Sequence, residues 1–104
     1  MGLSEMTFFQ RFEADILSGK KTITIRDVSE KDYSPNSIVQ VSTYENGRWF
    51  CRLKIQNVVA IKFSQLSNFH AKQENMTLVE LKSVIQEIYP NIENLYVISF
   101  ELID

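Results

Sequence analysis

Reactive polar side chains are concentrated in one stretch of the chain, residues 19–26, which reads Gly-Lys-Lys-Thr-Ile-Thr-Ile-Arg. A neutral lysine can act as a general base, a threonine hydroxyl as a nucleophile, and an arginine as an anion-binding group. The combination therefore predicts a site for polar chemistry. Taken singly, each residue also has an ordinary structural role, since lysines often follow helices as solvated charges and threonine favours strands.

The stretch must be built from a helix end and a strand. Gly19 closes an apolar-periodic segment, so we expect it to adopt the left-handed conformation that follows a helix C-terminus. Threonine and isoleucine then alternate over residues 22–26. Because side chains alternate across a strand, the isoleucines should face one side, and the threonines and Arg26 the other.

Lys21 and Thr24 do not fit this alternation together, because residues three apart on a regular strand point to opposite faces. We expect Lys21 to lie in the turn after Gly19, before regular strand pairing begins, so that its long side chain reaches the Thr24 side. A structure with Lys20 on that side would change the choice of base.

The N-terminal half of the chain is predicted to hold a helix, a loop and a hairpin. Thr7 and Gln10 form a capping-box pattern before apolar residues at helical spacing, which predicts a helix over residues 8–18. Asn46 and Gly47 form a hairpin turn signal. The polar loop covers residues 27–37, and the two hairpin strands cover residues 38–44 and 49–57.

The C-terminal half is predicted to add two strands and two helices. A strand over residues 58–63 follows the hairpin after a bend or bulge. Thr77 with Glu80 is a second capping box, and it starts a helix that ends before Pro90. Glu74 falls between the two helices. The remaining elements are a short helix over residues 64–72 and a closing strand over residues 95–102.

Composition fits one soluble domain spanning residues 1–104, with 44% hydrophobic and 23% charged residues. The order of elements predicts an α+β fold, and mainly antiparallel strands in so small a domain tend to curl into a partly closed β-barrel with flanking helices. The sequence contains neither an apolar run of membrane-spanning length nor the features of a signal peptide. We therefore expect a cytoplasmic protein with no membrane partner.

Residue counts and charge disfavour two classes of site. The single cysteine and single histidine cannot form an internal disulfide or an ordinary zinc site, so we expect no metal and no cofactor. The net charge of −2 argues against a protein that grips a long nucleic-acid backbone. A local positive patch at Lys20, Lys21 and Arg26 could still hold one small polar or anionic ligand.

Three stretches, taken in order, resemble the small bacterial ASCH-domain proteins, and most closely those that act as N(4)-acetylcytidine amidohydrolases. They are residues 7–12 (Thr-Phe-Phe-Gln-Arg-Phe), residues 19–26 and residues 73–78 (Gln-Glu-Asn-Met-Thr-Leu). The likeness covers nearly the whole chain. It implies a barrel similar to the RNA-binding PUA fold, and an amidohydrolase that converts a small modified nucleoside, N(4)-acetylcytidine, to cytidine and acetate.

The resemblance also implies roles for the matched residues, with Lys21 as the general base, Thr24 as the nucleophile and Glu74 as the proton donor. These roles need a lowered pKa for the Lys21 amine, from burial or nearby positive charge, and a raised pKa for the Glu74 carboxyl. Arg26 is the candidate substrate-binding residue. It either binds the substrate or its developing oxyanion, or forms a salt bridge with Asp27, Glu30 or Glu74.

Other interpretations of the sequence stay open. The alternative function is a non-catalytic PUA-like module that binds RNA or a nucleoside, and an enzyme could also bind RNA weakly. His70 lies one turn before Glu74 and could contact the site, although a lone histidine on an apolar helix face is usually a hydrogen-bonded packing residue. We interpret Cys51, in the middle of the hairpin, as a core thiol. We expect a monomer.

Overall fold

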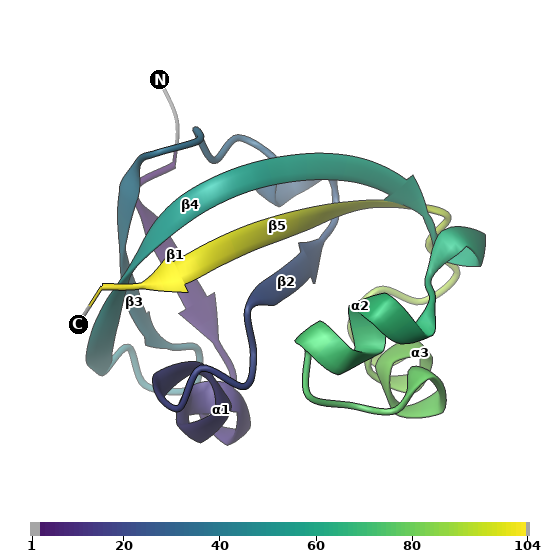
Figure 1. Cartoon of the computed structure of the whole chain (residues 1–104), viewed down its shortest axis with the longest axis horizontal. Coiled ribbons are helices and arrows are strands. Elements are labelled where there is room, and N and C mark those ends of the chain that lie inside the picture. The colour runs from purple at the N-terminus through teal and green to yellow at the C-terminus, as the bar shows by residue number, and fades with distance from the viewer. Residues whose placement is uncertain (1–2, 104) are drawn as a thin grey trace.

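The computed structural model describes residues 3–103, and its strands form one sheet in the order β1-β3-β4-β5-β2 (Figure 1). β1 pairs with β3 in parallel, and the other neighbouring strands pair antiparallel. The strands are β1 (Glu5–Phe8), β2 (Ile23–Arg26), β3 (Ile38–Thr43), β4 (Trp49–Lys62) and β5 (Asn94–Leu102). The helices are α1 (Glu13–Leu17), α2 (Asn68–Gln73) and α3 (Leu78–Ile88), with short 3-10 segments η1 (Gln10–Phe12), η2 (Val28–Glu30) and η3 (Phe63–Gln65).

The predicted α+β class is confirmed, but strand pairing does not close the sheet within residues 3–103. β1 and β2 are the two ends of the strand order, and they are not paired with each other. The long strands β4 and β5 arch across the molecule and bring these ends toward one another (Figure 1). Arg26 of β2 spans the gap, donating a hydrogen bond of 2.6 Å from Nη2 to the carbonyl oxygen of Thr7 in β1.

The helix predicted over residues 8–18 was wrong at its N-terminal end. Thr7 and Phe8 belong to β1, and the helical segment consists only of η1 and α1. No side-chain hydrogen bond caps the start of η1. The physical reason is that Met6 and Phe8 are buried on one face of β1, exposed to only 2% and 4%. Burying both side chains against β3 outweighs a capping pattern that stabilises by about 1 kcal/mol.

The hairpin prediction is confirmed. β3 and β4 pair antiparallel, and Gly47 in the turn adopts a left-handed φ of +70°. The strand predicted over residues 58–63 is the second half of β4, which runs on without interruption. Its pairing register with β5 shifts between Ile55 and Asn57, as expected for a bulge.

The second capping box is confirmed at the start of α3. Thr77 Oγ1 accepts a hydrogen bond of 3.2 Å from the Glu80 amide, and the Thr77 amide donates one of 3.0 Å to Glu80 Oε1. The short helix predicted over residues 64–72 is divided into η3 and α2. None of the helices between residues 3 and 103 is long and apolar enough to cross a membrane.

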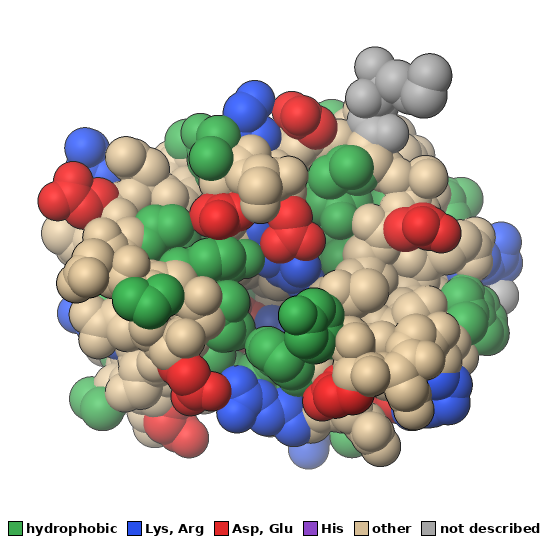
Figure 2. Space-filling view, turned by 180° about the vertical axis from the view of Figure 1, so that it is seen from behind, with side chains coloured by type: hydrophobic (Ala, Val, Ile, Leu, Met, Phe, Trp, Pro, Cys, Tyr) green, Lys and Arg blue, Asp and Glu red, His purple; other side chains and the backbone are tan. Residues whose placement is uncertain are grey.

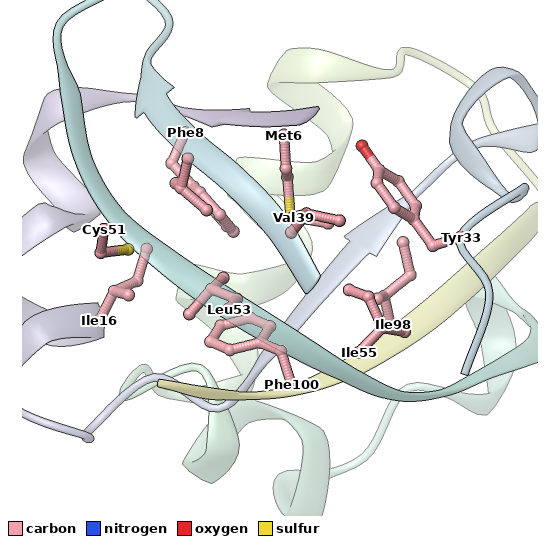
Figure 3. Packing of buried hydrophobic residues seen from close by; sticks show 11 residues of the cluster. Met6, Phe8, Ile16, Tyr33, Val39, Cys51, Leu53, Ile55, Ile98 and Phe100 are labelled. Carbon is pink, nitrogen blue, oxygen red and sulfur yellow. The ribbon is translucent and has the colours of Figure 1, made fainter. Parts of the chain in front are cut away.

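Apolar side chains are buried in two clusters. The first lies mainly between β1, β3, β4 and α1, and Figure 3 shows its packing. The second joins β2 and one face of β5 to α2 and α3. Neighbouring residues of β5, Val97 and Ile98, belong to different clusters, so this strand divides the core. Cys51 lies in the first cluster, in agreement with its interpretation as a core thiol.

We expect Leu53→Ala to lower the free energy of unfolding by about 2 to 5 kcal/mol, because Leu53 of β4 is fully buried and its truncation leaves a cavity. Val59→Ala on the same strand should cost less than about 1 kcal/mol, since Val59 is 49% exposed. Urea unfolding measures both values. Equal losses in the two variants would contradict this placement of the core.

Candidate active site

A cavity of about 230 Å³ brings together the four predicted site residues, Lys21, Thr24, Arg26 and Glu74. Figure 2 shows this face of the molecule hollowed, with basic side chains in its depth and hydrophobic and acidic side chains around it. The apolar part of the wall comes from α3 and the turns at its two ends, from β1 and β2, and from the segments after β1 and β3. Its residues are Phe8, Phe9, Phe12, Ile25, Tyr44, Met76, Leu81, Val84, Ile85, Ile88 and Tyr89.

The turn after α1 places Lys21 in this cavity. Gly19 adopts the expected left-handed φ of +79°, and the amides of Lys20 and Lys21 both donate to the carbonyl oxygen of Asp15, at 2.9 and 3.0 Å. Lys21 therefore precedes Ile23, the first residue of β2, and escapes the strand alternation as expected. Its side chain is 3% exposed, whereas Lys20 faces solvent.

Glu74 reaches the cavity from the junction between α2 and α3. It is the C-cap residue of α2, and the following Asn75 turns the chain with a left-handed φ of +57°. One residue earlier, the carbonyl oxygen of Gln73 accepts a hydrogen bond of 2.8 Å from the amide of Thr22. This bond fixes the helix junction beside the start of β2.

Lys21 Nζ and Glu74 Oε1 form a buried ion pair, with side chains 3% and 6% exposed. A pair that holds one proton between its two members can be written as an ammonium beside a carboxylate, or as a neutral amine beside a carboxylic acid. Both forms have the same total charge, and they differ only by transfer of one proton across the contact. The arrangement can therefore present a base and an acid in the same cavity.

Burial lowers the pKa of the Lys21 ammonium well below its usual range, as the proposed base needs. The positive charge of Arg26 lowers this pKa further, and the negative charge of Asp15 acts in the opposite direction. Nζ lies 5.6 Å from the ring centre of Phe8 and 5.1 Å from that of Phe12. These aromatic faces replace part of the interaction with water that the buried charge has lost.

Thr24 is 4% exposed, and its hydroxyl is hydrogen-bonded to Arg26. Arg26 Nε donates to Thr24 Oγ1 at 2.8 Å. Since the hydroxyl oxygen accepts this bond, its own hydrogen remains available for donation to a base. A guanidinium charge at this distance also stabilises negative charge that develops on the oxygen.

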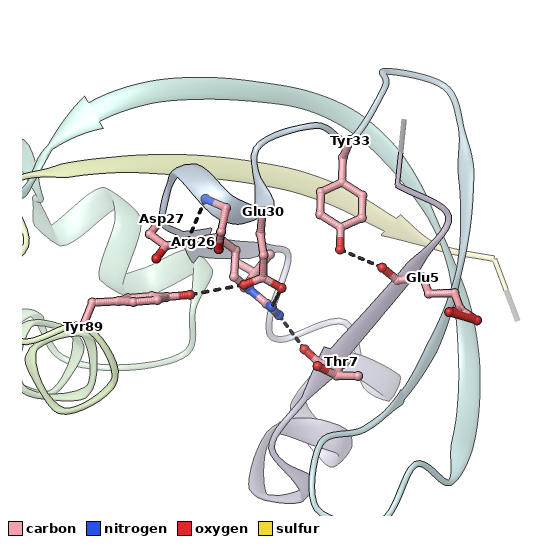
Figure 4. Close-up of polar contacts among 9 residues, drawn as sticks. Glu5, Thr7, Arg26, Asp27, Glu30, Tyr33 and Tyr89 are labelled. Atoms are coloured by element: carbon pink, nitrogen blue, oxygen red, sulfur yellow. Dashed lines mark hydrogen bonds and ion pairs between the residues drawn. The ribbon is translucent and has the colours of Figure 1, made fainter. Parts of the chain in front are cut away.

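Arg26 forms the salt bridge that the sequence left as one of two alternatives, and its partner is Glu30. Nη1 donates to Glu30 Oε1 at 2.9 Å, while the phenol of Tyr89 donates to Glu30 Oε2 at 3.3 Å (Figure 4). Sequence reasoning missed Tyr89, because this residue is 59 positions from Glu30 and no local pattern joins them.

His70 does not line the cavity. Its Nδ1 accepts a hydrogen bond of 3.2 Å from the amide of Ser67, and so it helps to cap α2. This is the hydrogen-bonded role that the sequence favoured for a lone histidine. Across residues 3–103, no group of three or more His, Cys, Asp or Glu side chains is placed to hold a metal ion.

Lys21→Met should remove a pH dependence of stability. Because the pKa of Lys21 is lowered, the folded protein can lose the one proton that Lys21 and Glu74 share at a pH where Lys21 of the unfolded chain still keeps its proton. From that pH up to about 10.4 the unfolded chain binds more protons, and the free energy of unfolding of the wild type rises with pH. Urea unfolding between about pH 7 and about pH 9.5 should show this rise in the wild type and not in Lys21→Met.

The matched control is Lys20→Met, which removes an exposed lysine and should keep the wild-type slope. The pH range stops below the point where tyrosines titrate. The folded-state pKa values of Tyr33 and Tyr89 are raised to about 12, mainly by burial, and these groups give the opposite slope at higher pH. A rise of the same size in Lys21→Met and in the wild type would contradict the lowered pKa of Lys21.

Comparison with known proteins identifies the family. The model of the ASCH domain matches residues 4–103. The N(4)-acetylcytidine amidohydrolase of Vibrio vulnificus (strain YJ016) is 68% identical over 98 residues, or 94% of each chain. The protein of that name in Shewanella oneidensis is 54% identical over 101 residues, or 97% of each chain.

Solved structures support the same fold. An ASCH domain from Lactobacillus crispatus has a TM-score of 0.77 at 15% identity, covering 97% of this chain and 80% of that one. ASCH from Zymomonas mobilis has a TM-score of 0.72 at 11% identity, covering 93% of this chain and 65% of that one. The resemblance inferred from three short stretches is thereby confirmed, and this chain belongs to the ASCH domain family.

Proposed function

We propose that this protein is an amidohydrolase that removes the acetyl group from N(4)-acetylcytidine and releases cytidine and acetate. The observation that carries the proposal is the buried contact between Lys21 and Glu74, in the same cavity as the hydrogen-bonded hydroxyl of Thr24. A relative that is 68% identical over 94% of the chain bears the name of this activity. The apolar wall offers a surface for the flat pyrimidine ring and the acetyl methyl group.

The first half of the proposed reaction transfers the acetyl group to Thr24. Neutral Lys21 takes the hydroxyl proton while Oγ1 attacks the acetyl carbonyl, and the charge of Arg26 opposes the cost of the developing oxyanion. The intermediate then collapses, the bond from the acetyl carbon to N4 breaks, and protonated Glu74 gives its proton to N4. Cytidine leaves with its amino group restored, and the site is left with an ammonium beside a carboxylate.

The second half hydrolyses the acyl-threonine. The Glu74 carboxylate takes a proton from water, whose oxygen attacks the ester carbonyl. When the bond to Oγ1 breaks, the Lys21 ammonium returns a proton to Thr24, and acetic acid leaves and ionises. Lys21 and Glu74 end in the neutral forms in which they began, so the pair exchanges one proton in each direction during a turnover.

Purified protein should release cytidine from N(4)-acetylcytidine, and Thr24→Ala should lower the rate constant by about 10³-fold or more, because the nucleophile is removed. Thr24→Ser keeps a hydroxyl and should retain measurable activity. Chromatographic separation of the two nucleosides gives both rates. Release that survives in Thr24→Ala would indicate a directly activated water instead. A wild-type protein that binds the nucleoside without releasing cytidine would overturn the proposal in favour of a binding module.

Glu74→Gln tests the acid role through the leaving group. The amide cannot give up a proton as the carboxylic acid does, so cytidine release should fall about 10²- to 10⁴-fold. With 4-nitrophenyl acetate the leaving phenolate needs no protonation, so the first-turnover release of 4-nitrophenolate, which precedes hydrolysis of the acyl-threonine, should fall much less in Glu74→Gln than in Thr24→Ala. Equal losses on the amide and the ester would contradict proton donation by Glu74 and leave it a structural partner of Lys21.

A further inference from the structure

We propose that Glu30 and Tyr89 are positioning residues, which hold Arg26 so that its Nε donates to the hydroxyl of Thr24. This inference rests on the proposed function, in which Thr24 is the nucleophile. Neither residue needs to touch the reacting atoms. Each acts through a hydrogen bond to the next member of a chain that runs from Tyr89 through Glu30 and Arg26 to Thr24. Figure 4 shows the first three of these residues.

The direction in which Arg26 Nε points is set by the other end of the guanidinium. The group is planar and rigid, so two fixed hydrogen bonds at Nη1 and Nη2 also fix the direction of the Nε–H bond. Nη1 donates to Glu30 and Nη2 to the carbonyl oxygen of Thr7. The second acceptor is backbone in β1, which no side-chain substitution removes, so Glu30 is the partner through which the sequence can tune this geometry.

Glu30 is itself held from two sides. Its Oε1 accepts from Arg26 and its Oε2 accepts from Tyr89, so both carboxylate oxygens are engaged within the protein. The backbone beneath it is also ordered, because the Asp27 side chain caps η2 by accepting a hydrogen bond of 3.0 Å from the Ser29 amide. A carboxylate with both oxygens bonded inside the protein is suited to hold its neighbour in place.

Tyr89 links this chain to α3. It is the C-cap residue of that helix, and its phenol is half-buried beside Glu30. Burial and the Glu30 charge raise the pKa of Tyr89 to about 12, so the phenol remains a donor throughout the neutral range. Tyr89, at the end of α3, thus holds Glu30, and Glu30 holds Arg26. The other end of α3 follows the turn that carries Glu74.

The test compares matched pairs of variants. Tyr89→Phe and Tyr33→Phe each remove one phenol hydroxyl that feels the charges of Arg26 and Glu30, but the Tyr33 hydroxyl donates to the carbonyl oxygen of Glu5 at 2.7 Å and not to Glu30. Glu30→Gln and Glu13→Gln each weaken one arginine salt bridge, and that of Glu13 is with Arg48. Circular dichroism and thermal unfolding establish that every variant is folded before it is assayed.

Cytidine release from N(4)-acetylcytidine gives the first readout. We expect kcat to fall about 10- to 100-fold in Glu30→Gln, where Arg26 loses its orientation. In Tyr89→Phe we expect a fall of about 3- to 10-fold, the effect of one hydrogen bond. KM should change less than kcat in both variants, because the hydrogen bond that they weaken, from Arg26 to Thr24, acts on the reacting hydroxyl. Tyr33→Phe and Glu13→Gln should keep the wild-type kcat.

Hydrogen exchange at Arg26 Nε, followed by nuclear magnetic resonance, gives a readout that needs no activity. The Nε–H signal, assigned by its loss in Arg26→Lys, should exchange at least about tenfold faster in Glu30→Gln and Tyr89→Phe than in the wild type, because a loosened guanidinium breaks its bond to Thr24 more often. The two control variants should leave this exchange unchanged.

Unchanged kcat together with unchanged Nε–H exchange in Glu30→Gln and Tyr89→Phe would overturn the inference. The same holds if the control variants lose as much activity as their matched partners. Failure of the proposed function has a different signature, in which the wild type releases no cytidine. In that case, faster Nε–H exchange in Glu30→Gln and Tyr89→Phe would still support the role of Glu30 and Tyr89 in holding Arg26. Unchanged exchange would contradict that role too.

Discussion

Burial of Lys21 against Glu74 is the constraint to which the rest of the structure responds. Taking two charged groups out of water costs several kcal/mol for each, and their mutual attraction offsets this only when the geometry is good. The fold fixes that geometry from both sides. The turn at Gly19 anchors the lysine through two amides on Asp15, and the helix junction that carries the glutamate is bonded to the first residues leading into β2. A less rigid frame would let water solvate both side chains, and the pKa of Lys21 would return toward its usual value.

The second contribution of the frame is electrostatic. Arg26 places a positive charge beside both Thr24 and Lys21, and these two effects cooperate. A cation makes the lysine give up its proton more readily, which favours the neutral amine, and it also makes an oxygen anion on the threonine less costly. The Arg26 charge thus favours the neutral form of the proposed base, Lys21, and lowers the cost of the oxygen anion on the proposed nucleophile, Thr24. Glu30 limits how much uncompensated positive charge the cavity holds.

Local signals in the sequence were enough to predict the hairpin, the capping box at Thr77 and the departure of Lys21 from strand alternation, because each depends on a few neighbouring residues. The strand at residues 5–8 was missed, and Phe8 was assigned to a helix, for the opposite reason. Residues 5–8 form a strand only because β3, more than thirty positions later, offers an edge to pair with. The contact between Tyr89 and Glu30 also depends on the tertiary arrangement. Sequence could name the candidate site residues that the cavity brings together, but not the groups that hold them.

The unpaired edges of the sheet have a consequence for what the cavity can admit. In a closed barrel, the separation of neighbouring strands is set by a ladder of backbone hydrogen bonds and is nearly invariant. Between β1 and β2 there is no such ladder in the part of the chain that the structure describes. Instead, the Arg26 side chain donates a hydrogen bond across the gap to the carbonyl oxygen of Thr7. The width of the part of the cavity that β1 and β2 line therefore depends on side-chain contacts. A substitution at Arg26 can change this width without breaking a backbone hydrogen bond between strands.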